Sequence, residues 1–213
     1  MDIRLREGYR CTRLRPKTRT MKALELGPDW LAAEMPPGYN TRMLEIQRLS
    51  EELKMMGQFG RLLWTVGDEL ADAVREAFVA LKFEVASTPA MPKSSVTVNL
   101  DGRRRLLLHV SQSGAAIEKK SPDLARLFQM LHEVANDDDR IVLVANTDPA
   151  TPPSRRGDGV DTDAMKLLRR LGANLLFAPT LFAVWTLSLQ DRERARASIE
   201  RLHAQDGGTF ELR

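Results

Sequence analysis

The residues of this chain that could perform metal-dependent or acid–base chemistry are concentrated between positions 94 and 120. This stretch contains Asp101, His109 and Ser111, and it ends with Glu118 and two lysines. A hard cation such as Mg²⁺ needs several carboxylate or carbonyl oxygens around it. Asp101, however, is followed by glycine in a dipeptide typical of a tight turn, and Glu118 follows a polar loop where charged side chains are ordinarily solvated. The stretch therefore predicts no complete catalytic set.

No other motif supplies a catalytic centre. The single cysteine, Cys11, and the three histidines do not have the spacing of a zinc site. The sequence contains no glycine-rich phosphate loop, no nucleophile elbow and no His-Glu-x-x-His motif. Asp161 and Asp163 form an acidic pair, but they lie at an expected helix start, where the helix dipole favours negative charge. We therefore expect no enzyme activity, no metal and no cofactor.

The composition is that of an ordinary globular protein with a small positive charge. The 32 basic residues nearly balance the 29 acidic ones and leave a net charge of +3, so the charge permits polyanion binding without requiring it. A single cysteine excludes an internal disulfide framework and suits a reducing compartment. No apolar run approaches the roughly 20 residues of a membrane span. We expect a soluble cytoplasmic protein that does not enter a membrane.

The elements that must position residues 94–120 begin with a β-hairpin. Residues 95–100 alternate between apolar and polar side chains, the Asp-Gly turn follows, and residues 105–110 form a second apolar run. Apolar spacing predicts a helix at 68–82 before the hairpin. A serine followed by proline and aspartate predicts a second helix at 121–135 after it. The inward side chains expected on that second helix are Leu124, Leu127, Phe128, Leu131 and Val134.

The rest of the chain alternates between strands and helices. A short strand is expected near Phe83 and Val85, and residues 141–146 form a continuous apolar run of the kind buried on both faces in a parallel sheet. The remaining expected elements are a long loop at 147–160, a helix at 161–171, a strand at 174–177 and helices at 181–189 and 191–204. This order predicts the α/β class, with a mixed sheet flanked by helices.

Residues 1–40 differ from the rest of the chain. They are rich in arginine and lysine and are interrupted by prolines, which predicts an irregular basic arm, and residues 41–213 are expected to form one domain. This domain begins with a long helix at 41–66. Its apolar residues follow the three-and-four spacing of a helix seam and include Ile46, Leu49, Leu53 and Met56. Two alternatives fit this seam: a short coiled coil with a second copy of the chain, or packing on the domain's own sheet.

Four segments together resemble the PD-(D/E)XK, or restriction-endonuclease-like, superfamily. They are LLWTVGDELADAVREAFVALKFEV from Leu62, residues 106–112, IVLVAN at 141–146 and LLFAPTLFAVW at 175–185. The similarity covers roughly residues 44–202 and rests on element order and hydrophobic pattern. It implies a restriction-endonuclease-like mixed sheet flanked by helices. In that superfamily the hairpin carries an acid and a Glu-x-Lys motif that serve a divalent cation.

The positions that the resemblance assigns to this chemistry hold other residues. The first acid falls near Ser95 or Thr97, and the Glu-x-Lys motif falls on His109 and Ser111. A further acid expected on the first helix is replaced by Ala71. A neutral imidazole and hydroxyl groups are poor substitutes for the carboxylate ligands of Mg²⁺. The resemblance is therefore to a degenerate member that has lost its catalytic set.

Several basic residues offer a second kind of surface. If the resemblance holds, Arg103, Arg104 and Arg105 with Lys119 and Lys120 flank the cleft where related enzymes hold a nucleic-acid backbone. Clustered charge is sufficient for phosphate contacts, so binding can outlast catalysis. The same arginines can equally serve only to keep a solvent-facing hairpin soluble.

Together these observations predict a non-catalytic binding or scaffold module. We expect a homodimer that pairs through the first helix and presents another surface to an unknown protein partner. A non-catalytic nucleic-acid-binding protein is the alternative, and a residual Mg²⁺-dependent nuclease is a further alternative.

Overall fold

The computed structural model describes residues 34–87 and 92–212. The chain divides after Leu49 into two compact units, Met1–Leu49 and Ser50–Arg213. The described part of the first unit holds the beginning of helix α2 (Tyr39–Phe59), and the second unit holds the sheet and the other helices. Most of the predicted basic arm at 1–40 lies outside the described residues.

Helix α2 ends earlier than the sequence predicts. The expected helix at 41–66 is divided, because α2 stops at Phe59 and a 3₁₀ turn, η1 (Gly60–Leu63), follows it. Glycines at 57 and 60 each weaken an α-helix by roughly 1 kcal/mol relative to alanine, which favours a break here. Helix α3 (Gly67–Ala80) then starts at Gly67, whose φ of +64° is a conformation that glycine adopts easily.

Within the described residues the sheet has six strands, which lie in the order in which they occur in the sequence. The strands are β1 (Glu84–Ala86), β2 (Ser95–Asn99), β3 (Arg105–Val110), β4 (Asp139–Ala145), β5 (Asn174–Phe177) and β6 (Gly208–Thr209). The pairs β1–β2 and β2–β3 are antiparallel, whereas β4, β5 and β6 continue the sheet in parallel. The predictions of a hairpin and of a buried parallel strand near 141–146 are therefore confirmed.

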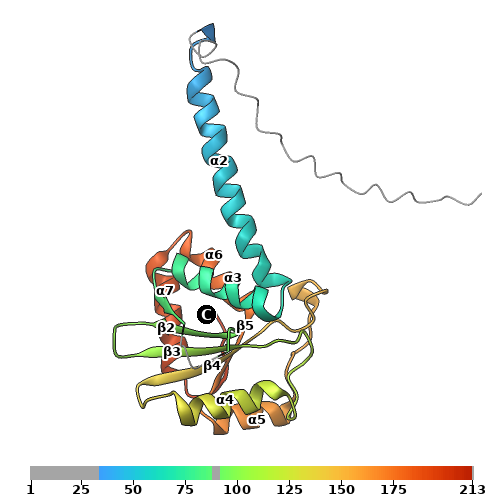
Figure 1. Cartoon of the computed structure of the whole chain (residues 1–213). Coiled ribbons are helices and arrows are strands. Elements are labelled where there is room, and N and C mark those ends of the chain that lie inside the picture. The colour runs from blue at the N-terminus through green and yellow to red at the C-terminus, as the bar shows by residue number, and fades with distance from the viewer. Residues whose placement is uncertain (1–33, 88–91, 213) are drawn as a thin grey trace, which may run out of the picture. The chain divides into compact units, whose positions relative to one another are not determined.

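Helices cover both faces of this mixed sheet (Figure 1). Helices α3, α6 (Ala178–Ser188) and α7 (Arg192–Ala204) pack on what we call the first face, where the core includes Leu106 and Leu108. Helices α4 (Pro122–Glu133) and α5 (Thr162–Arg170) pack on the second face, where the core includes Leu107 and Leu143. The protein is thus of the mixed α/β class.

The inward face of α4 was predicted with two errors. Leu124 and Leu127 are buried as predicted, and Leu131 and Val134 are partly buried. Met130 is also buried although it was not predicted, whereas Phe128 is 54% exposed and makes an edge contact with the ring of His132. Since the buried positions repeat every three residues, Phe128 lies at the margin of the stripe and faces solvent. Among the helices of the described residues, none is both long and apolar enough to cross a membrane.

Candidate functional site

Strand register brings together most of the positions that the resemblance assigns to catalysis. Ser95 on β2 lies opposite His109 on β3, and Thr97 lies opposite Leu107. Because side chains alternate along a strand, these residues and Ser111 lie on the second face, together with Leu107. Ala71 does not join them. It is fully buried in the core of the first face, so the sheet separates it from the other positions.

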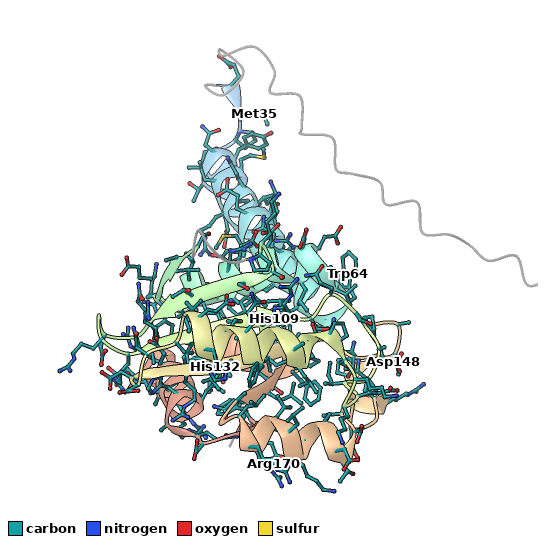
Figure 2. The ribbon with its side chains drawn as sticks, turned by 60° about the horizontal axis from the view of Figure 1, so that its bottom comes forward. Met35, Trp64, His109, His132, Asp148 and Arg170 are labelled. Atoms are coloured by element: carbon teal, nitrogen blue, oxygen red, sulfur yellow. The ribbon has the colours of Figure 1, made fainter. Side chains whose placement is uncertain are left out.

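Asp123 completes this group, although the sequence indicated only a helix start at that position. It lies in the first turn of α4, directly after Pro122, and is only 6% exposed. One carboxylate oxygen is 2.9 Å from Nε2 of His109, and the other accepts a hydrogen bond of 2.8 Å from Oγ of Ser111. Since an ionised carboxylate has only acceptors, Nε2 carries the proton. We call Ser95, His109, Ser111 and Asp123 the polar cluster (Figure 2 labels His109).

The electrostatics of the polar cluster favour a charged Asp123. Burial by itself raises the pKa of this carboxyl, but the hydrogen bonds from His109 and Ser111 outweigh it and hold the pKa below its ordinary value. The positive end of α4 favours the same charge state. His109 is therefore a buried, hydrogen-bonded histidine near the end of β3.

The polar cluster holds few groups that could bind a metal. Both oxygens of Asp123 already accept hydrogen bonds, and Ser95 contributes a buried hydroxyl without a partner among the described residues. Throughout residues 34–87 and 92–212, no three His, Cys, Asp or Glu side chains gather closely enough to hold a metal ion. Asp101 instead accepts hydrogen bonds from the backbone N–H groups of Arg103 and Arg104, as predicted for a turn residue.

The predicted arginine contacts are paired with acids. Arg105 makes a bidentate pair with the buried side chain of Asp139, at 2.9 and 2.5 Å. Arg104 pairs with Asp101 at 2.6 Å and with Glu200 at 3.8 Å.

Arg103 lies 3.9 Å from the carboxylate of Asp138 and is otherwise exposed. Lys119 and Lys120 are exposed, but they follow the carboxyl end of β3, whereas the arginines precede or begin that strand. The six residues of β3 span about 20 Å, so the two groups lie at opposite ends of the sheet and do not flank one cleft. Nucleic-acid binding remains an untested prediction.

Arg156 forms a second polar group that the sequence did not reveal. Its guanidinium donates to Oδ1 of Asn146 at 2.6 Å, to the carbonyl of Thr151 at 2.8 Å and to that of Leu63 at 2.5 Å. Asn146 in turn donates to the carbonyl of Thr65 at 2.8 Å. These bonds attach the loop after β4 to the turn before α3. Arg156 therefore has a structural role.

The predicted seam of α2 is exposed. Ile46, Leu49, Leu53 and Met56, which we call the α2 stripe, are 47%, 44%, 69% and 47% exposed, respectively. Leu53 and Met56 belong to the same unit as the sheet, and their exposure contradicts the alternative in which they pack on it.

Comparison with known proteins gives no assignment. No protein-family model, no curated protein and no solved structure matches this chain significantly.

Proposed function

We propose that this chain is a non-catalytic domain of the restriction-endonuclease-like type that acts as an assembly module, pairing with a second copy of itself through α2. The observation that carries the proposal is the α2 stripe. Its members are separated by three, four and three residues, which is the spacing of the seam between two helices in a coiled coil. A continuous apolar seam that stays exposed in the single chain favours a partner.

A second copy is the partner that the stripe fits best. A two-fold pair is the commonest form of assembly, and it covers the same stripe on both chains at once. Each half-exposed side chain gains roughly 1 kcal/mol on burial. Two helices therefore gain about 8 kcal/mol, against an association cost of roughly 4–15 kcal/mol. At the low end of this cost about 4 kcal/mol remains, which corresponds to a dissociation constant of about 1 mM and therefore to a weak dimer whose population depends on concentration.

The polar cluster supports the non-catalytic part of the proposal. At the positions that the resemblance assigns to metal ligands, His109 and Ser111 both hydrogen-bond to Asp123. A buried carboxylate whose oxygens are both occupied is a structural element. The proposed restriction-endonuclease-like type is supported by the order of the strands, in which the antiparallel strands β1–β3 are followed by the parallel strands β4 and β5.

Sedimentation velocity across a concentration series tests the assembly. We expect the weight-average mass of the full chain to rise from that of a monomer toward that of a dimer. Replacing Leu53 with glutamate (Leu53→Glu) puts a charge in the seam and should keep the chain monomeric at every concentration, because burying an unpaired charge is costly.

Gln58→Glu is the matched control. It adds the same charge to α2 outside the seam, so it should leave the concentration dependence of the mass unchanged. A wild-type chain that remains monomeric at about 1 mM would contradict the proposal, and so would an equal effect of the two variants.

A further inference from the structure

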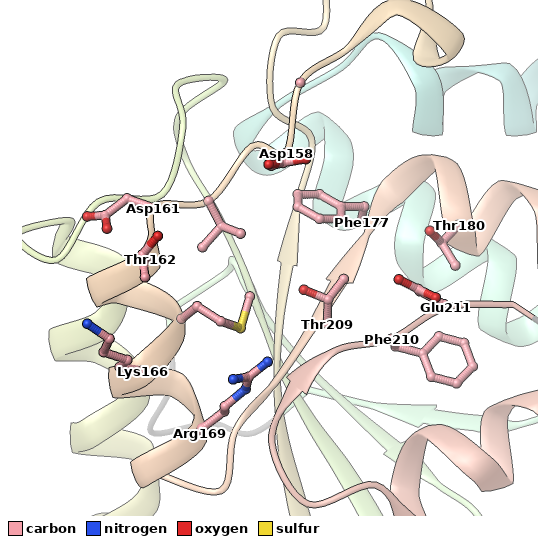
Figure 3. A pocket seen from close by; sticks show the side chains of 13 residues that line it. Asp158, Asp161, Thr162, Lys166, Arg169, Phe177, Thr180, Thr209, Phe210 and Glu211 are labelled. Atoms are coloured by element: carbon pink, nitrogen blue, oxygen red, sulfur yellow. The ribbon is translucent and has the colours of Figure 1, made fainter.

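A hollow of about 600 Å³ lies between α5, the loop before it, and the end of the chain around β6. It opens beside Phe177, the last residue of β5, and Thr180, in the first turn of α6 (Figure 3). In open α/β sheets, ligands bind outside the carboxyl ends of parallel strands. The volume is in the range of small-molecule sites. We call this hollow the α5–β6 pocket.

Arg169 places an unused cation in the α5–β6 pocket. Its guanidinium points into the hollow toward Thr209, and within the described residues no hydrogen bond or ion pair engages it (Figure 3). Two glycines let β6 approach closely: Gly207 and Gly208 have φ of +76° and +105°, and a Cβ on Gly207 would lie 3.0 Å from the Cα of Arg169. The backbone of β6 therefore packs against the arginine.

The acidic groups of the α5–β6 pocket differ in what they already bind. Asp161 caps α5, accepting from the N–H of Asp163, and Lys166 pairs with Asp163 at 3.0 Å. Asp158 and Glu211 also line the pocket, and no described residue pairs with either carboxylate. Arg169, Asp158 and Glu211 are thus the charged side chains of the pocket that have no partner among the described residues.

Apolar side chains form the rest of the wall. Val160, Met165, Phe177 and Phe210 all line the hollow, and the ring of Phe177 lies close to the loop. A Cβ on Gly159 would lie 3.0 Å from that ring, so the loop backbone packs directly on it. A ligand in this space meets an apolar surface between charges of opposite sign.

We infer that the α5–β6 pocket binds a small zwitterion of the amino-acid type, with its carboxylate on Arg169, its ammonium group on Asp158 or Glu211, and an apolar side chain against Phe177. Arginine pairs with carboxylates in a planar, bidentate geometry that suits this role. Asp158 and Glu211 disfavour the binding of a ligand that carries only negative charge, since like charges in one site repel. Binding of this kind is separate from assembly through α2.

Free L-phenylalanine is the probe that tests the inference. Titration followed by protein NMR should give saturable shift changes confined to the amides around the α5–β6 pocket, with an affinity in the millimolar range typical of so small a ligand. Phenylacetate lacks the ammonium group and phenethylamine lacks the carboxylate. Each should bind roughly tenfold more weakly than the zwitterion, because each leaves one charged hydrogen bond unmade.

Arg169→Gln and Arg170→Gln form a matched pair. Both arginines lie in the last turn of α5 and complement its dipole equally, but only Arg169 lines the pocket. We expect Arg169→Gln to weaken L-phenylalanine binding roughly tenfold and Arg170→Gln to leave it unchanged.

Glu211→Gln provides a second variant at an exposed position near the chain end, where unfolding is not a concern. It should weaken L-phenylalanine binding but leave phenylacetate binding unchanged. Absence of saturable binding, equal effects of the two arginine variants, or equal affinity for all three probes would overturn the inference.

Discussion

The two faces of the sheet are built from the same strands but hold different kinds of core. On the first face, β3 and β4 contribute Leu106, Leu108, Val142 and Val144 to an apolar core under α3 and α6. On the second face, Leu107 and Leu143 pack under α4 and α5, but the next position along β3 is His109, and the polar cluster replaces apolar packing there.

This difference shows how a buried carboxylate can serve as a structural element of a sheet core. Burying a carboxylate is unfavourable unless its oxygens are hydrogen-bonded, and the polar cluster meets this requirement with one donor on β3, His109, and one directly after the strand, Ser111. The core of the first face is formed by apolar side chains, and its polar bonds lie at the margin, where Asn146 donates to the carbonyl of Thr65. The second face keeps polar side chains at the carboxyl end of β3, where the resemblance places metal ligands, and satisfies most of them internally.

The largest expected effect comes from putting acids back into the polar cluster. The double replacement Ser95→Asp and His109→Glu would place two carboxylates beside Asp123, since Ser95 and His109 face each other across the strands. Without a cation, buried and unpaired charges should lower the free energy of unfolding by roughly 3–5 kcal/mol. Mn²⁺ at about a hundred times its dissociation constant should restore about 2.7 kcal/mol. Thermal unfolding with and without Mn²⁺ measures both changes.

The isosteric pair Ser95→Asn and His109→Gln separates charge from shape in this experiment. It changes the same positions without adding carboxylates, so Mn²⁺ should not shift its unfolding temperature. An equal response of the two double variants, or of the wild-type chain, would show that the second face does not have the arrangement of a vacated cation site.

The elements of both faces could be predicted from the sequence because each depends on local periodicity. The alternation at 95–100 and the Asp-Gly turn predicted the β2–β3 hairpin, and the apolar run at 141–146 predicted a parallel central strand. The spacing at 161–171 predicted α5 to within a residue at each end. Strand β6 was missed, since it has only two residues, one of them Gly208, and so has no periodic pattern.

The polar cluster and the role of Arg156 could not be predicted in the same way. Asp123 lies 14 residues from His109, and only the packing of α4 on the sheet brings them within 2.9 Å. A signal was present: an acid in the first turn of a helix that follows a strand with polar residues at its end. Arg156 resembled any surface arginine, because its acceptors are backbone carbonyls and an amide.

Two serines of the polar cluster provide a smaller and sharper test. Oγ of Ser111 donates to Asp123, whereas the buried Oγ of Ser95 has no partner among the described residues. Ser111→Ala should lower the free energy of unfolding by roughly 1.5–3 kcal/mol, because it removes a hydrogen bond to a charged group. Ser95→Ala should be neutral or slightly stabilising. Chemical denaturation of both variants makes the comparison, and equal losses would contradict the described hydrogen bonding.

The smallest expected effect is the dependence of stability on acid pH. The pKa of Asp123 is held below its ordinary value, so its contribution is complete above the unfolded pKa of about 3.9 and is lost as the pH falls through the folded pKa. Asp123→Asn removes this titration, and the stability difference between wild type and variant should therefore shrink below about pH 4.

Asp101 has a pKa lowered to about 2, mainly by hydrogen bonds from the backbone and side chain of Arg104, but it is exposed. Asp101→Asn should therefore change stability far less at every pH. If the stability of the two variants depended on acid pH in the same way, the burial of Asp123 would not distinguish it from the exposed Asp101.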